Sequence, residues 1–157
     1  MFYLAYGSNI NSSEMKERCG NTEIEYVTSG YLDGFKLVFD GFSKKRKGLV
    51  ADIRLANGSK TPFVLWRILS KEANFKLDSC EGFIKNNDPR NLYTKISIDI
   101  PGYSNVFAYV MTHSYIAKRG DCRTIPMDYV NTIRNGYKEF RLDETYLDSA
   151  ILETSKL

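Results

Sequence analysis

The sequence predicts an α+β fold: a curled, barrel-like mixed sheet, in effect a small mixed β-barrel, with helices around it. Strand-like segments are grouped together rather than alternating strictly with helices, and the last third of the chain is helical in its apolar spacing. The chain also has 11 tyrosines, a residue that favours half-buried, pleated surfaces. Its 157 residues fit a single domain, 1–157, because one domain takes roughly 100–200 residues.

The predicted strands are short apolar or alternating runs bounded by turn residues. The first covers residues 2–6 and enters a polar turn. Later runs cover 24–31, 34–40, 48–55, 61–69, 92–100 and 105–112. Asp33-Gly34 and Asn57-Gly58 have the composition of two-residue hairpin turns, so we expect them to separate strands.

Helix starts are predicted from capping residues. Asn11 followed by Glu14 resembles a capping box, which favours a short helix directly after the first turn. Ser70 has the position of an N-cap for a helix over about 71–80, whose apolar residues recur at i, i+4 and i+7. Pro126 suits the first turn of a later helix, and a second apolar stripe follows near the C-terminus.

Charge and cysteine usage narrow the function classes. The net charge of +3 is too mild for a general nucleic-acid footprint, and the three cysteines lack zinc-site spacing. No leader segment or apolar run of about 20 residues is seen. We therefore expect a soluble, cytoplasmic protein, monomeric or homodimeric, without metal, cofactor, nucleic-acid or membrane partner. Ser155-Lys156-Leu157 matches a peroxisomal address, interpreted here as a coincidental tail.

The first candidate site is the turn Tyr6-Gly7-Ser8-Asn9, between a strand and a helix. Glycine lets the backbone approach a ligand without an interposed Cβ. Successive amide N–H groups and the positive end of the helix form an anion site, to which Tyr6, Ser8 and Asn9 add donors. A purely structural turn is the alternative interpretation.

The second candidate is Glu81, at the expected C-terminal end of the 71–80 helix. The helix dipole is negative there, so it should raise the pKa of the carboxyl group, and burial would raise that pKa further. A carboxylate with a raised pKa suits a general base that acts on an amine near neutral pH. A solvated helix end is the alternative.

Together these segments resemble the γ-glutamyl cyclotransferase family over nearly the whole chain. The matching pieces are Tyr3 to Asn9, Phe63-Val64-Leu65-Trp66, Leu77-Asp78-Ser79-Cys80-Glu81-Gly82, Tyr93, Tyr109-Val110-Met111-Thr112 and Pro126-Met127-Asp128-Tyr129. The resemblance implies a small mixed barrel with its pocket between these elements. The region 113–125 has no clear counterpart.

The resemblance also implies roles for individual residues. Glu81 would be the catalytic acid/base, and Tyr129 would close the pocket. The remaining substrate-binding residues would be Tyr3, Leu4, Ala5, Tyr6, Gly7, Ser8, Asn9 and Tyr93. The implied reaction cyclises a small-molecule γ-glutamyl substrate to 5-oxoproline and needs no cofactor. The substrate would be a γ-glutamyl amino acid, a γ-glutamyl amine or a γ-glutamyl-protected intermediate.

Other functions stay open at this point. One is a non-catalytic module that binds γ-glutamyl groups or anions; another is a small nucleic-acid-binding barrel that uses the basic run 44–47. That run is otherwise a solvated hairpin loop or a guide for anionic substrates. His113 is interpreted as structural or solvent-facing, Cys80 as a packed thiol and Trp66 as core.

Overall fold

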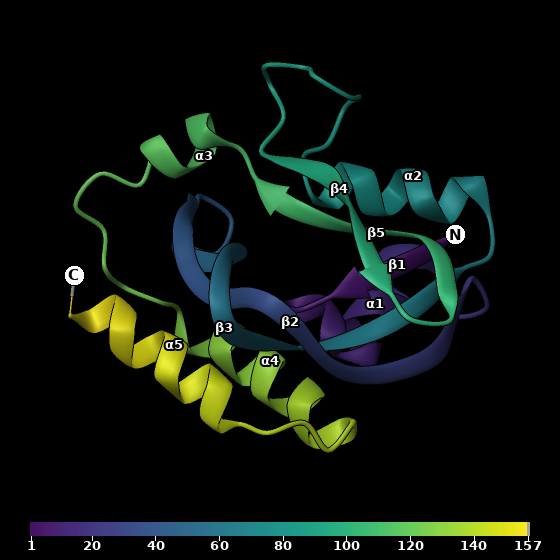
Figure 1. Ribbon diagram of the computed structural model, residues 1–157. Coiled ribbons are helices and arrows are strands. Elements are labelled where there is room, and N and C mark those ends of the chain that lie inside the picture. The colour runs from purple at the N-terminus through teal and green to yellow at the C-terminus, as the bar shows by residue number, and fades with distance from the viewer. Residues whose placement is uncertain (157) are drawn as a thin grey trace.

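The structure is a computed structural model that describes residues 1–156. Its elements in chain order are β1 (Phe2–Ala5), the 3₁₀ helix η1 (Ser8–Ile10), α1 (Ser12–Cys19), β2 (Ile24–Ser43), β3 (Gly48–Ile68), α2 (Lys71–Cys80), β4 (Tyr93–Ile100), β5 (Tyr103–Met111), α3 (His113–Ala117), α4 (Met127–Glu139) and α5 (Thr145–Ser155). Figure 1 shows the curved sheet with α4 and α5 along one side and α2 on another.

The predicted α+β class is confirmed. Five strands form one mixed sheet in the order β2-β3-β1-β5-β4. The central strand β1 pairs antiparallel with β3 and parallel with β5, whereas β2 pairs antiparallel with β3 and β4 antiparallel with β5. Among residues 1–156 the edge strands β2 and β4 do not pair, so the sheet is strongly curved but open. The term barrel therefore describes its curvature and not a closed ring of hydrogen bonds.

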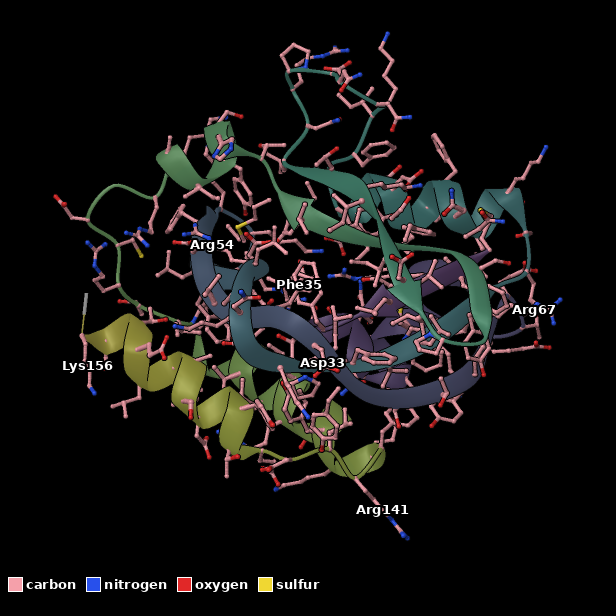
Figure 2. The ribbon with its side chains drawn as sticks, viewed as in Figure 1. Asp33, Phe35, Arg54, Arg67, Arg141 and Lys156 are labelled. Carbon is pink, nitrogen blue, oxygen red and sulfur yellow. The ribbon has the colours of Figure 1, made fainter. Side chains whose placement is uncertain are left out.

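The four strands predicted between residues 24 and 69 are in fact two long ones, β2 and β3. Asp33-Gly34 does not reverse the chain but forms a register shift inside β2, and the pairing jumps from Lys60 to Leu55 on β3. Gly34 has φ of 80°, and a bulge uses the same positive φ as a hairpin turn. The prediction of a hairpin turn at Asp33-Gly34 was wrong for this reason. The turn predicted at Asn57-Gly58 was also wrong, because this pair lies inside β3, in the segment that the pairing skips. Figure 2 shows Asp33 and Phe35 at this bend.

The chain reversal between β2 and β3 lies instead at residues 44–47. This confirms the prediction that the basic run forms a hairpin loop. Figure 1 shows this end of the hairpin beside α3. Arg54, labelled in Figure 2, lies near this end on β3.

The capping predictions are confirmed. The side chain of Asn11 accepts a hydrogen bond from the backbone N–H of Glu14 and caps α1, and Ser70 caps α2 through the N–H of Ala73. His113 begins the short helix α3, rather than ending a strand, and is exposed as expected. Among residues 1–156 no helix is long and apolar enough to cross a membrane. The C-terminal tripeptide ends at Leu157, which lies outside the described residues.

The helix α4 positions the turn that follows β1. Gly136 lies on the buried face of α4, and a Cβ atom there would be 2.8 Å from the backbone nitrogen of Asn11 and 2.8 Å from Cγ2 of Ile10. Glycine therefore allows the α4 backbone to approach the end of η1 closely. This contact supports the Gly7 turn from behind.

Candidate active site

A cavity of about 700 Å³ opens beside the Gly7 turn. This volume lies within the roughly 300–1,000 Å³ typical of small-molecule sites. The predicted site residues that line it are Tyr3, Tyr6, Gly7, Ser8, Asn9, Glu81, Tyr93 and Tyr129. They come from β1, η1, the end of α2, β4 and α4, so the fold brings together segments from both halves of the chain.

Leu4 and Ala5 are the two predicted site residues that do not line the cavity. Both side chains are fully buried in the core, and their backbones pair with Leu65 and Val64 of β3. Strand pairing occupies this part of β1. The turn whose backbone can bind an anion therefore starts only after β1 ends, at Tyr6.

Glu81 points into the cavity from the C-cap of α2, and its side chain is 13% exposed. Its Oε1 accepts hydrogen bonds from Asn9 Nδ2 at 2.9 Å and from Arg18 Nη1 at 3.0 Å. The helix end and the Gly7 turn are thus joined directly by side chains.

The pKa of Glu81 is raised, chiefly because the carboxyl group is buried. Arg18 opposes this shift, and Asn9 and Arg46 oppose it further, since they favour the ionised form. The direction agrees with the sequence-based expectation. The main cause is loss of solvent around the carboxylate, where the sequence argument had started from the helix dipole.

Asn9 is held on two sides. Its backbone oxygen accepts a hydrogen bond from Trp66 Nε1 at 2.8 Å, and its Nδ2 also donates to Tyr3 Oη at 3.0 Å. Trp66 is 2% exposed, as predicted for a core residue. These bonds fix the direction in which Asn9 presents its amide to Glu81.

Two buried tyrosines form hydrogen bonds with the backbone of one β3 residue on the other side of the cavity. Tyr93 Oη donates to the carbonyl of Ala51 at 2.9 Å, and Tyr129 Oη accepts from the N–H of Ala51 at 2.9 Å. Burial raises the pKa of both phenols, so both remain protonated at neutral pH. A Cβ at Gly7 would lie 3.3 Å from Ala51 Cβ and 3.4 Å from Tyr129 Oη. The turn therefore approaches this wall closely.

The backbone of the Gly7 turn has free donors. Its internal hydrogen bonds run from the N–H of Ile10 to the carbonyl of Gly7 and from the N–H of Asn11 to the carbonyl of Ser8. Within residues 1–156 no protein acceptor faces the N–H groups of Gly7, Ser8 and Asn9. Helix starts leave such groups free, and here they lie at the cavity wall.

Neither a known protein-family profile nor a curated protein matches this sequence. Solved structures do match. One described as γ-glutamyl cyclotransferase has a TM-score of 0.71 at 22% identity, with 95% of this chain and 85% of that chain covered. An uncharacterised human protein gives 0.69 at 23%, with the same coverage. A yeast γ-glutamyl cyclotransferase described as specific to glutathione gives 0.61 at 12%, with 99% and 96% covered.

The chain has a γ-glutamyl cyclotransferase-like fold. The likeness covers nearly all of this chain. At these identities it establishes the fold, and the chemistry of the site has to be argued from the side chains.

Arg18 and Arg46 belong to the cavity of this γ-glutamyl cyclotransferase-like fold but were not singled out individually from the sequence. Arg18 of α1 joins Glu81 to Glu14, and Arg46 of the hairpin loop also contacts Glu14. The spacing of Glu14 and Arg18, i and i+4 on a helix, was a visible pattern. Nothing in that pattern indicates that Glu81 joins them.

Cys80 does not fit the expectation of a packed thiol. It is exposed and lines the cavity beside Glu81. The buried residues of α2 are Ala73 and Leu77. The last turn of the helix therefore lies at the surface and not in the core. Within residues 1–156 no group of three or more histidine, cysteine or acidic side chains is arranged to hold a metal ion.

Proposed function

We propose that the protein is a γ-glutamyl cyclotransferase that converts a γ-glutamyl group to 5-oxoproline and releases the attached amine, with Glu81 as the general acid/base. The observation that supports this most strongly is the bond between Asn9 Nδ2 and Glu81 Oε1 at 2.9 Å, beside the free amides of the Gly7 turn. A proton-transferring group and an anion cradle thus share one cavity. The fold of the two structures named as cyclotransferases supports the same function.

The reaction makes three chemical demands. The substrate α-ammonium must lose a proton, its nitrogen must attack the γ-carbonyl carbon, and the nitrogen of the leaving amine must gain a proton as its bond to that carbon breaks. Glu81 takes the first proton from the ammonium and passes it to the leaving nitrogen. After the attack the ring nitrogen still carries one proton more than the lactam does. This second proton leaves by the same carboxylate, and the amine is released as an ammonium, so the protons balance. Such acid/base catalysis contributes typically about 10²–10⁴-fold.

The surroundings of Glu81 suit both halves of this role. Burial makes the carboxylate more basic, while Arg18, Asn9 and Arg46 keep the ionised form accessible. Arg18 and Arg46 also disfavour a positive charge nearby, so they promote proton loss from the substrate ammonium. Glu81 Oε1 is held by Asn9 and Arg18, and within the described residues Oε2 has no protein donor. Oε2 is the oxygen we assign to proton transfer.

The Gly7 turn supplies the anchor. Its free N–H groups bind either the α-carboxylate of the substrate or the oxyanion that forms at the γ-carbonyl, an interaction worth roughly 3–4 kcal/mol for an oxyanion donor. Confinement in the cavity, bounded on the far side by Tyr129, keeps the chain of the glutamyl group folded with its amine over the carbonyl. Such orientation is a large part of the rate gain when both reactants belong to one molecule.

The test is incubation with a panel of γ-glutamyl amino acids and γ-glutamyl amines, with 5-oxoproline followed by mass spectrometry. We expect release by the wild type and a loss of at least about 10²-fold in kcat for Glu81→Gln. Circular dichroism checks that the variant is folded. Glu72→Gln, at an exposed position of α2, is the matched control and should retain activity.

Two results would contradict the proposal. Full turnover by a folded Glu81→Gln variant would remove Glu81 from the mechanism. Tight binding of γ-glutamyl compounds without any 5-oxoproline would favour the non-catalytic binding module instead. Calorimetric titration of the same panel distinguishes that outcome from a lack of binding.

A further inference from the structure

The cavity is strongly cationic at its mouth. Five basic side chains line it: Arg18, Lys44, Lys45, Arg46 and Lys118. Glu81 is the one carboxylate among the lining residues of the described chain. Three of the five cations come from the β2–β3 hairpin loop and one from the end of α3, which lies beside that loop (Figure 1).

Only part of this charge is balanced by the protein. Arg18 pairs with Glu81 and Glu14, and Arg46 pairs with Glu14. No ion pair engages the three lysines within residues 1–156. Glu14, Glu17 and Asp128 lie in an adjoining hollow that Arg18, Lys45 and Arg46 also line. Lys44 and Lys118 line the cavity alone, where Glu81 is the one carboxylate of the described lining, so the positive charge of at least these two lysines is left unbalanced at the opening.

Arg46 is the cation best placed to contact a ligand. Its guanidinium lies over the ring of Tyr129, with Cζ 4.9 Å from the ring centre, and its side chain is 20% exposed. Only Nη2 has a protein acceptor, Glu14, so Nε and Nη1 remain available in the described part of the molecule. A guanidinium held on an aromatic ring is preorganised to bind carboxylate or phosphate oxygens.

The γ-glutamyl group itself does not use this excess. It carries one α-carboxylate and one α-ammonium, which cancel, and the Gly7 turn already offers it an anion cradle. The charge at the mouth therefore faces the other part of the substrate, the amine that is released. A mouth that bears one sign of charge concentrates ligands of the opposite sign.

We propose that the amine released by this enzyme carries two or more negative charges, bound by Arg46 together with Lys44, Lys45 and Lys118. This inference rests on the proposed cyclotransferase function and defines its substrate class. It selects anionic leaving groups over neutral amides and over cationic diamines, whose second ammonium would be repelled at the mouth.

The test compares γ-glutamyl substrates that differ in the charge of the leaving part. γ-Glutamyl-glycinamide has none, γ-glutamyl-glycine has one, and γ-glutamyl-glutamate has two. γ-Glutamyl-phosphoethanolamine also approaches two and distinguishes phosphate from carboxylate recognition. We expect kcat/KM to rise with charge, by at least about tenfold from the amide to the dianions at low salt, and the difference to shrink at high salt.

The variant that tests the site is Lys44→Gln/Lys45→Gln/Lys118→Gln, with Arg46→Gln as a second variant. Each should reduce the ratio of kcat/KM between dianion and amide by about tenfold. Lys60→Gln is the matched control, because Lys60 is 55% exposed on β3 and does not line the cavity. Its ratio should equal that of the wild type.

Calorimetric binding of the same compounds to Glu81→Gln supplies a readout independent of turnover. Equal rates for all four substrates, or a plateau at one charge, would overturn the inference while the cyclotransferase function stands. Preferential binding of dianions without any 5-oxoproline would sustain the anion site and overturn the cyclotransferase function. The absence of both turnover and binding would overturn the cyclotransferase function and the anion site together.

Discussion

Asn9 and Glu81 are separated by 72 positions in the sequence, yet Asn9 Nδ2 donates to Glu81 Oε1 at 2.9 Å. The bond joins the turn after β1 to the end of α2, and Asn9 is itself held by Trp66 of β3. Three distant segments thus fix one carboxylate relative to the Gly7 cradle. The predictions below concern this arrangement and the packing that supports it.

Removal of the Asn9 amide should misplace Glu81 without removing it. We expect Asn9→Ala to lower kcat by about 10²-fold, because a small misplacement of a reacting group has an effect of that size. KM should change less. Tyr3→Phe removes only the phenol that shares the Asn9 amide and should have a smaller effect on kcat. An equal loss in both variants would indicate that Tyr3, rather than the Asn9–Glu81 bond, controls the site.

Arg18 should control the pH at which Glu81 becomes active. Arg18 favours the ionised form of Glu81 and so opposes the burial that raises its pKa. In Arg18→Met the pKa of Glu81 should therefore rise, and the acidic limb of the kcat/KM profile should move to higher pH. Arg18→Lys keeps the charge and should shift less. Arg134→Met removes an arginine that pairs with Glu144 and Asp148 instead and should leave the profile in place.

Ionisation of Asp52 should lower the free energy of unfolding as pH rises. It is 2% exposed, and burial raises its pKa from 3.8 to about 6. A carboxyl group whose folded-state pKa is raised contributes stability below about pH 4, and that contribution is lost as pH rises through about 6. Asp52→Asn does not titrate, so its stability relative to wild type should increase between pH 4 and 7, by up to about 3 kcal/mol.

Urea denaturation at both pH values measures this difference. Asp33→Asn is the control, since the side chain of Asp33 is 82% exposed, and its effect should stay within about 0.5 kcal/mol. A pH-independent difference for Asp52→Asn would mean that its carboxyl has an ordinary pKa in the folded state.

Gly136→Ala should reverse the usual order of helix propensity. Alanine in a helix interior normally stabilises by about 1 kcal/mol over glycine. Here its Cβ would lie 2.8 Å from the Asn11 nitrogen, so the packing of α4 against η1 must open, and we expect a loss of about 1–3 kcal/mol. Asn135→Ala, at an exposed position of the same helix, should be neutral or slightly stabilising. Thermal unfolding of both variants checks the sign of the change in stability. A higher stability of Gly136→Ala would show that the packing of α4 against η1 adjusts to the added Cβ without cost.

Local patterns predicted the helices well and the long strands poorly. The caps Asn11 and Ser70 act within three residues of themselves, so their effect is visible in the sequence. Asp33-Gly34 supplies a positive φ, which a hairpin turn and a bulge both use. Which of them forms depends on the pairing of β2 with β3, and the residues of the turn carry no information about that partner.

The sequence by itself determined the α+β class, the helix over residues 71–80, the glycine turn after the first strand and the presence of Glu81 at a helix end, since each depends on neighbours a few positions away. Only the tertiary structure decided that Glu81 meets Asn9 and Arg18, that Leu4 and Ala5 turn into the core, and that Arg46 and three lysines gather at one opening. Burial and ion pairing depend on segments far apart in the chain. Their energies therefore exist only once the sheet has brought those segments together.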